Sequence, residues 1–174
     1  MITRRSFLKI GAAGAITLAA GGAFYRWSQP AATPHRFALD GEARAVLAAV
    51  IPVMLGPVLP AEAAARTAAI AAATARVRDA VLGLPLTTQK EVQDLFGLLA
   101  LGPGRRLLAG VSGGWEHADP KQVEAFLQNW RSHSFQTLQH AYLALHDLIL
   151  GAWYADPSSW DAIGYPGPLK ELLA

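Results

Sequence analysis

The sequence predicts an all-α protein, with a single small domain of about four to six helices preceded by an N-terminal signal or anchor helix. Three observations lead to this prediction. Apolar residues recur at helical spacing along most of the chain, as in helices with one buried face. No stretch alternates apolar and polar residues in the manner of a strand. Of the 174 residues, roughly 140 remain for the body, which is the size of one domain.

The first expected helix of the body follows Asp40, whose short carboxylate side chain is suited to cap a helix N-terminus. The apolar positions after it have helical spacing: Ala43, Val46, Leu47, Val50 and Ile51. We expect Pro52 to interrupt this helix, because proline lacks the amide hydrogen that an internal helix position donates. The segment Gly-Pro-Val-Leu-Pro at 56–60 then predicts a loop.

Two further helices follow in the sequence. The stretch 62–82 is rich in alanine, the residue with the highest helix propensity, and the Gly-Leu-Pro after it ends that helix. Thr88, followed three residues later by Glu91, has the spacing of a capping box and predicts the next helix start. Gly-Pro-Gly at 102–104 is expected to stop this second helix.

The second half of the body predicts a short helix at 105–111, a flexible loop from 112, and then two longer apolar stripes. Asp119 and Pro120 signal a helix start, since they combine a cap with a proline at the first helical position. The stripes, interrupted at 132–134, comprise Val123, Phe126, Leu127, Trp130, Phe135, Leu138, Tyr142, Leu145, Ile149 and Trp153.

The chain therefore divides into a signal or anchor segment at 1–27, a linker at 28–39 and a helical domain at 40–174 with an aromatic tail rich in proline and glycine. A basic start followed by an uncharged apolar run is typical of export signals. The order Thr-Arg-Arg-Ser-Phe-Leu-Lys at 3–9 resembles the twin-arginine (Tat) signal at every defined position. This resemblance implies export of an already folded protein to the periplasm, and it assigns recognition by the translocase to Arg4, Arg5, Phe7 and Leu8. Cleavage of the signal and its retention as an anchor both stay open.

The charges do not favour a nucleic-acid-binding protein. The chain has 15 lysines and arginines against 13 aspartates and glutamates. Four of the basic residues lie before residue 28, which leaves 11 in the rest of the chain against all 13 acidic ones. A body with this balance is not typical of proteins that bind phosphate backbones. The absence of cysteine excludes disulfides, thiolate-held iron–sulfur clusters and c-type haem attachment.

The sequence contains no convincing catalytic or cofactor motif. Metal-binding histidines on a helix are commonly four residues apart, whereas His133 and His140 are seven apart. Gly-Val-Ser-Gly-Gly at 110–114 has the letters of a nucleophile elbow but follows no expected strand. We therefore predict that the chain is not an enzyme and holds neither a cofactor nor a metal, and that its histidines have structural or surface roles.

The C-terminal segment 152–169 combines flat aromatic side chains with turn residues. Trp153, Tyr154, Trp160 and Tyr165 lie among three prolines and two glycines. Aromatic side chains on a fixed backbone lose little entropy on contact, which suits an anchor at a protein interface. An interface with a partner and a tail that wraps back over its own helices are both compatible with this composition.

The segment Trp-Asp-Ala-Ile-Gly-Tyr-Pro-Gly-Pro at 160–168, together with the Tat signal, the all-helical body and Val-Ile-Pro at 50–52, resembles the gluconate 2-dehydrogenase subunit 3 family. The resemblance implies a non-catalytic small subunit that escorts a signal-less FAD-dependent dehydrogenase subunit of the glucose–methanol–choline type through the Tat pathway. In the periplasm this subunit would stabilise its partner, associated with the membrane if its N-terminal helix is kept. FAD is then expected in the partner and not in this chain, and a multihaem cytochrome c is a further expected partner.

We expect the partner interface at the aromatic and proline residues of the tail: Trp153, Tyr154, Trp160, Tyr165 and Pro166. The alternative is a free-standing periplasmic helical protein that binds a small ligand, or a metal through His133 and His140. An enzyme acting on its own is the third hypothesis.

Overall fold

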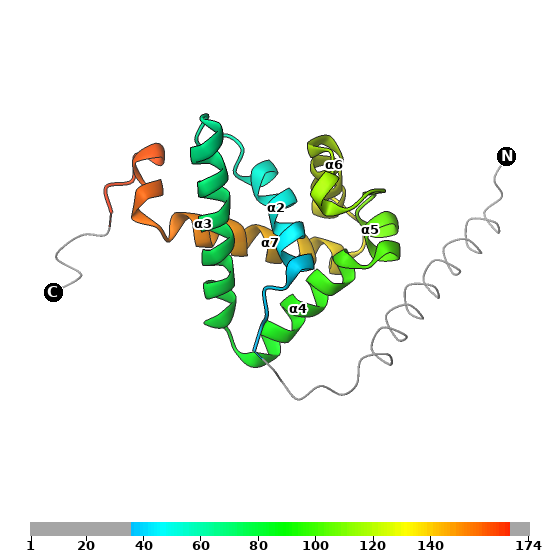
Figure 1. Cartoon of the computed structure of the whole chain (residues 1–174). Coiled ribbons are helices and arrows are strands. Elements are labelled where there is room, and N and C mark those ends of the chain that lie inside the picture. Colours follow the sequence, from blue (N-terminus) through cyan, green and yellow to red (C-terminus); the bar gives the residue numbers. More distant parts are fainter. Residues whose placement is uncertain (1–35, 168–174) are drawn as a thin grey trace, which may run out of the picture. The chain divides into compact units, whose positions relative to one another are not determined.

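The computed structural model describes residues 36–167, and within that range the chain forms six α-helices, three 3₁₀ turns and no β-strand (Figure 1). The helices are α2 (Gly41–Met54), α3 (Ala63–Leu82), α4 (Leu86–Ala100), α5 (Gly102–Leu108), α6 (Pro120–Arg131) and α7 (Gln136–Tyr154). The 3₁₀ turns are η1 (Trp115–His117), η2 (Pro157–Ser159) and η3 (Asp161–Ile163). The predicted all-α class is thus confirmed for the body. The expected signal or anchor helix at 1–27 lies outside the described residues.

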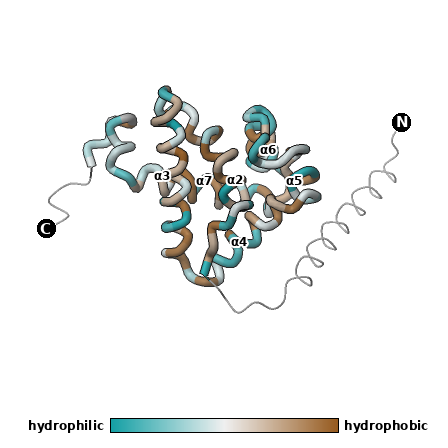
Figure 2. The backbone as a smooth tube through the Cα atoms, viewed as in Figure 1, coloured by the Kyte–Doolittle hydropathy of each residue, from teal (hydrophilic) through white to brown (hydrophobic). Residues whose placement is uncertain are grey.

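Helix α2 forms the centre of the core, because it packs against α3, α4, α6 and α7 and against η1. The apolar positions expected on its buried face are all 0% exposed: Ala43, Val46, Leu47, Val50 and Ile51. Hydrophobic residues are concentrated where α2, α3 and α7 meet (Figure 2). Full burial of one Val, Leu or Ile side chain contributes roughly 1.5–3 kcal/mol. The stripe on α2 is therefore a main source of hydrophobic stabilisation.

Three helices have an acidic residue as their N-cap, and the sequence predicted two of these, Asp40 and Asp119. Asp40 Oδ1 accepts a hydrogen bond from the amide of Ala43 at 2.7 Å, and Asp119 Oδ1 accepts one from the amide of Lys121 at 2.8 Å. Glu62 caps α3 in the same way, with its two carboxylate oxygens. These bonds satisfy amide groups that have no partner inside the helix.

The prediction that Pro52 interrupts the first helix is wrong. Helix α2 continues through it to Met54, and the amide of Leu55 still donates to the carbonyl of Ile51 at 2.9 Å. Proline removes one backbone hydrogen bond, and here the loss falls in the last turn of the helix. The burial of Ile51 and Leu55 on either side of Pro52 stabilises the helical conformation and offsets the loss of this hydrogen bond.

The predicted capping box at Thr88 and Glu91 is also wrong, since α4 starts at Leu86 and no side chain caps it. The side chain that connects this end of α4 to its surroundings is Gln89, which is only 4% exposed. Its Oε1 accepts from the amide of Phe37 at 2.9 Å, and its Nε2 donates to the carbonyls of Leu84 at 2.8 Å and Leu82 at 3.2 Å. A buried amide with these bonds is fully compensated. It joins the first residues of the domain to the turn between α3 and α4.

Helix α4 ends at Ala100, just before Gly-Pro-Gly at 102–104, as expected. The same three residues form the first turn of α5, which covers Gly102–Leu108 rather than the predicted 105–111. Pro103 sits in that first turn, where its missing amide hydrogen costs nothing. The expected flexible loop from 112 contains η1, whose Trp115 is only 5% exposed. The Trp115 indole donates to the carbonyl of Leu99 at 2.8 Å. Packing of this one indole orders the segment.

The two expected apolar stripes form α6 and α7, which pack against each other. Val123, Phe126, Leu127 and Trp130 are buried as predicted, but Phe135, expected in the second stripe, precedes α7 and is 60% exposed. Helix α7, 19 residues long, also packs against the 20-residue α3. Within residues 36–167, no helix is both long and apolar enough to cross a membrane.

Candidate interaction site in the aromatic tail

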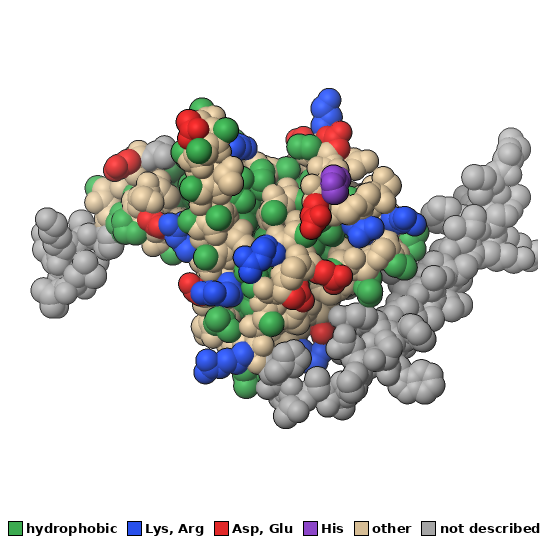
Figure 3. All heavy atoms as spheres, viewed as in Figure 1, with side chains coloured by type: hydrophobic (Ala, Val, Ile, Leu, Met, Phe, Trp, Pro, Cys, Tyr) green, Lys and Arg blue, Asp and Glu red, His purple; other side chains and the backbone are tan. Residues whose placement is uncertain are grey.

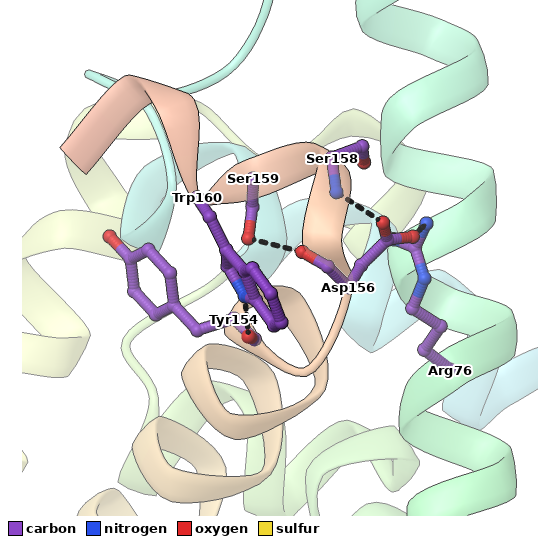
Figure 4. A network of polar contacts seen from close by, with 6 residues as sticks. All are labelled: Arg76, Tyr154, Asp156, Ser158, Ser159 and Trp160. Atoms are coloured by element: carbon purple, nitrogen blue, oxygen red, sulfur yellow. Dashed lines mark hydrogen bonds and ion pairs between the residues drawn. The ribbon is translucent and has the colours of Figure 1, made fainter. Parts of the chain in front are cut away.

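The aromatic tail, residues 153–167, begins in the last turn of α7 and is tied to the domain by Asp156. One carboxylate oxygen of Asp156 accepts a hydrogen bond from the amide of Ser158 at 2.8 Å, and its carbonyl accepts one from Ser159 Oγ at 2.7 Å. The other carboxylate oxygen forms an ion pair with the guanidinium of Arg76 on α3 (Figure 4). The two side chains of the pair are 22% and 32% exposed. Asp156 thus starts η2 and joins it to a helix 80 residues earlier in the chain.

Trp160 organises the next part of the tail. Its indole donates to the carbonyl of Tyr154, the last residue of α7, at 2.8 Å (Figure 4). Its ring meets that of Tyr165 edge to face, with centroids 5.2 Å apart and an interplanar angle of 74°. The amide of Tyr165 also donates to the carbonyl of Trp160 at 3.0 Å. This geometry is favourable for an aromatic pair and fixes the position of Tyr165.

Two glycines allow the chain to turn around Trp160. Gly164 has a φ of 67° and Gly167 a φ of 92°, values that residues with a side chain rarely adopt. A Cβ atom at Gly167 would also lie 3.1 Å from Cζ3 of Trp160. Glycine at 164 and 167 is therefore required by the path of the backbone, and at 167 also by close approach to the indole.

The five tail residues named in the sequence analysis differ in exposure. Trp153 is half-buried and packs against the core, with its indole nitrogen buried and without a hydrogen-bond partner among the described residues. Tyr154 and Trp160 are half-buried, whereas Tyr165 is 45% exposed and Pro166 is exposed. Ile163, which the sequence analysis did not single out, is 50% exposed beside them. The tail thus has a half-buried part, formed by Trp153, Tyr154 and Trp160, and exposed side chains at Ile163, Tyr165 and Pro166.

Sequence reasoning missed the residues that hold the tail in place, Arg76 and Asp156. Asp-Pro at 156–157 carried a usable signal, because Asp before Pro is typical of a helical N-cap. No local signal in the sequence pointed to Arg76, which lies within the alanine-rich helix α3. Only the packing of α3 against α7 brings the guanidinium of Arg76 to the carboxylate of Asp156.

Among the described residues, the candidate histidines do not come together in a second site. Arg4, Arg5, Phe7 and Leu8 lie outside the described residues. His133 Nδ1 accepts a hydrogen bond from the amide of Phe135 at 3.0 Å, and the two rings stack with centroids 5.2 Å apart. His140 is exposed on α7. Among residues 36–167, no group of three or more His, Cys, Asp or Glu side chains is placed to hold a metal ion.

Comparison with known proteins gives no further identification: no family model, no curated protein and no solved structure matches this chain. The function is therefore inferred from the residues of the chain and from the geometry of the tail.

Proposed function

We propose that this chain is a non-catalytic small subunit that carries a signal-less FAD-dependent dehydrogenase subunit of the glucose–methanol–choline type through the Tat pathway. In the periplasm it stabilises that subunit, and a multihaem cytochrome c completes the complex. The observation that carries the proposal is the Tat-type motif at 3–9 on a chain whose C-terminal Trp160–Pro168 segment resembles that of the gluconate 2-dehydrogenase subunit 3 family. A signal for folded cargo is useful when a partner must bind its cofactor before export.

The geometry of the tail supports this proposal because the exposed groups are already held in place. Tyr165 is fixed by its ring contact and amide bond with Trp160, and Trp160 is fixed by Tyr154. Side chains that are ordered before binding lose less conformational entropy in the complex. Tyrosine and tryptophan are also enriched among the residues that dominate interface energies. On this proposal, Ile163, Tyr165 and Pro166 contact the flavoprotein while Trp160 supports them.

The alternative, a metal-binding protein that uses His133 and His140, is less favoured by the geometry. The bond from the Phe135 amide occupies Nδ1 of His133, so that only the other ring nitrogen is free to ligate. Metal analysis of the purified protein would revive this alternative if it found a stoichiometric transition metal.

The proposal is tested by purification of the tagged full chain from its native host. We expect a large partner to co-purify and to show the near-ultraviolet and blue absorption bands of oxidised flavin. Changing Trp160→Ala together with Tyr165→Ala should remove that flavin, because truncation of such anchors typically costs about 2 kcal/mol or more each. Phe135→Ala is the matched control, since Phe135 is an exposed aromatic residue outside the tail.

Two results would contradict the proposal. A single colourless band from the unaltered protein would show that no flavoprotein is carried. Equal flavin in the double variant and the control would place the interface elsewhere. Circular dichroism of both variants distinguishes a lost contact from a lost fold.

A further inference from the structure

A hollow of about 530 Å³ lies where α2, α3, α6 and α7 meet, and no residue of the aromatic tail lines it. Figure 3 shows the surface dipping at the upper edge between the start of α3 and α6. Its apolar lining comes mainly from Val53, Met54, Leu127 and Leu150. Leu127 is buried, at 5% exposure, and the other three are half-buried. The hollow thus has an apolar lining contributed by three different helices.

The polar lining of the hollow is rich in hydrogen-bond donors. Arg66 enters from α3, Lys121 from α6, and Tyr142 and His146 from α7, while Glu124 is the only acidic residue in the lining. The ion pairs found within residues 36–167 involve neither Arg66 nor Lys121. The charges therefore favour a ligand that brings an anionic acceptor.

We propose that this hollow binds a small carboxylate that carries a compact apolar body. The carboxylate pairs with Arg66 and Lys121, and the apolar body covers the lining formed by Val53, Met54 and Leu150. The volume lies within the range of about 300–1,000 Å³ that is typical of small-ligand sites. The proposal involves neither His133 nor His140, and it does not depend on the escort function.

The experiment is a titration of the purified full chain, without any partner, with phenylpropanoate as the probe. Heteronuclear NMR should show saturable shifts at Tyr142, His146 and Leu150. The neutral amide of the probe, phenylpropanamide, should bind at least about tenfold more weakly, since hydrogen bonds to charged groups contribute about 1.5–3 kcal/mol. Changing Arg66→Met together with Lys121→Met should weaken binding of the acid to the level of the amide.

The matched control is Arg78→Met together with Lys90→Met, because both residues form ion pairs away from the hollow. This control should bind phenylpropanoate as the unaltered protein does. Equal affinity for acid and amide, unchanged affinity in the Arg66 and Lys121 variant, or shifts confined to other surfaces would each overturn the proposal. The NMR chemical shifts of core residues in each ligand-free variant, if they match those of the unaltered protein, verify that the variant is folded.

Discussion

At the scale of the residue, Gly104 shows how one missing side chain permits a close helix contact. Gly104 is buried in α5, and a Cβ atom there would overlap the carbonyl oxygen of Leu98 on α4. Backbone atoms cannot move aside as the end of a flexible side chain does, so the two helices would have to separate. The sharp connection between α4 and α5 therefore depends on glycine at this position.

We predict that Gly104→Ala lowers the free energy of unfolding by about 1–3 kcal/mol, the usual cost of forcing extra volume into a packed site. Gly102→Ala is the control, because a Cβ atom there meets nothing within 4 Å. Urea denaturation followed by circular dichroism measures both changes. Equal stability of the two variants would show that α5 shifts without cost.

At the scale of the element, indole groups complete the C-terminal ends of helices. Trp115 donates to Leu99 at the end of α4, Trp130 donates to Leu108 at the end of α5, and Trp160 donates to Tyr154 at the end of α7. The last carbonyls of a helix have no partner inside it, and a buried indole needs an acceptor. Each contact meets both requirements at once. The rings of Trp115 and Trp130 also both contact that of Phe126, with ring centroids 5.8 and 4.7 Å from it.

The N-terminus of α3 gives a prediction that depends on pH. Hydrogen bonds from the amides of Ala64 and Ala65, at 2.8 and 2.6 Å, lower the pKa of Glu62 from its ordinary value. A lowered pKa in the folded state means that this stabilisation is present above the ordinary glutamate pKa. It is lost as the pH falls through the lower, folded-state pKa.

Changing Glu62→Ala should therefore destabilise α3 near neutral pH, and the stability difference from the unaltered protein should shrink on acidification through that window. Thermal unfolding at a series of pH values measures the difference. Glu62→Gln is the control, since glutamine keeps one acceptor oxygen but does not titrate. The stability difference between Glu62→Gln and Glu62→Ala should therefore be the same at every pH. If the stability difference between the unaltered protein and each variant does not change with pH, the role of the Glu62 charge is contradicted.

At the scale of the whole molecule, the ion pair between Arg76 and Asp156 joins the aromatic tail to the helical core. Both partners are only partly buried, so solvent weakens their attraction and the pair should contribute at most about 1 kcal/mol to global stability. Its main effect is local, because it fixes where η2 starts on the surface of α3. The ion pair therefore holds the tail in place more than it stabilises the core.

We predict that Arg76→Met leaves the melting temperature nearly unchanged but speeds amide hydrogen exchange at Ser158 and Ser159. On the proposed function, it also weakens co-purification of the flavoprotein. Arg78→Met is the matched control, because Arg78 lies on the same helix and pairs with its neighbour Asp79. Hydrogen exchange by mass spectrometry or NMR compares the two variants. Identical exchange in both would show that the tail is held without the ion pair.

Sequence alone determined the features that depend on neighbours a few residues apart. The caps Asp40 and Asp119 and the alanine-rich α3 were predictable because their hydrogen bonds and propensities act within one or two turns. The same holds for the buried stripes of α2 and α6. The aromatic tail was also recognisable as a candidate site, though not the division of its side chains into a half-buried part and an exposed part.

Tertiary structure decided what joins distant parts of the chain. Gln89, in the first turn of α4, accepts a hydrogen bond from the amide of Phe37, 52 residues earlier, and Arg76 meets Asp156 across 80 residues. The hollow likewise draws its lining from four helices. Such contacts have no period or motif in the sequence, because they depend on which helix faces the hydrophobic core brings together. The sequence therefore determined the all-α class and the candidate tail, and packing decided several helix boundaries and how the helices are held.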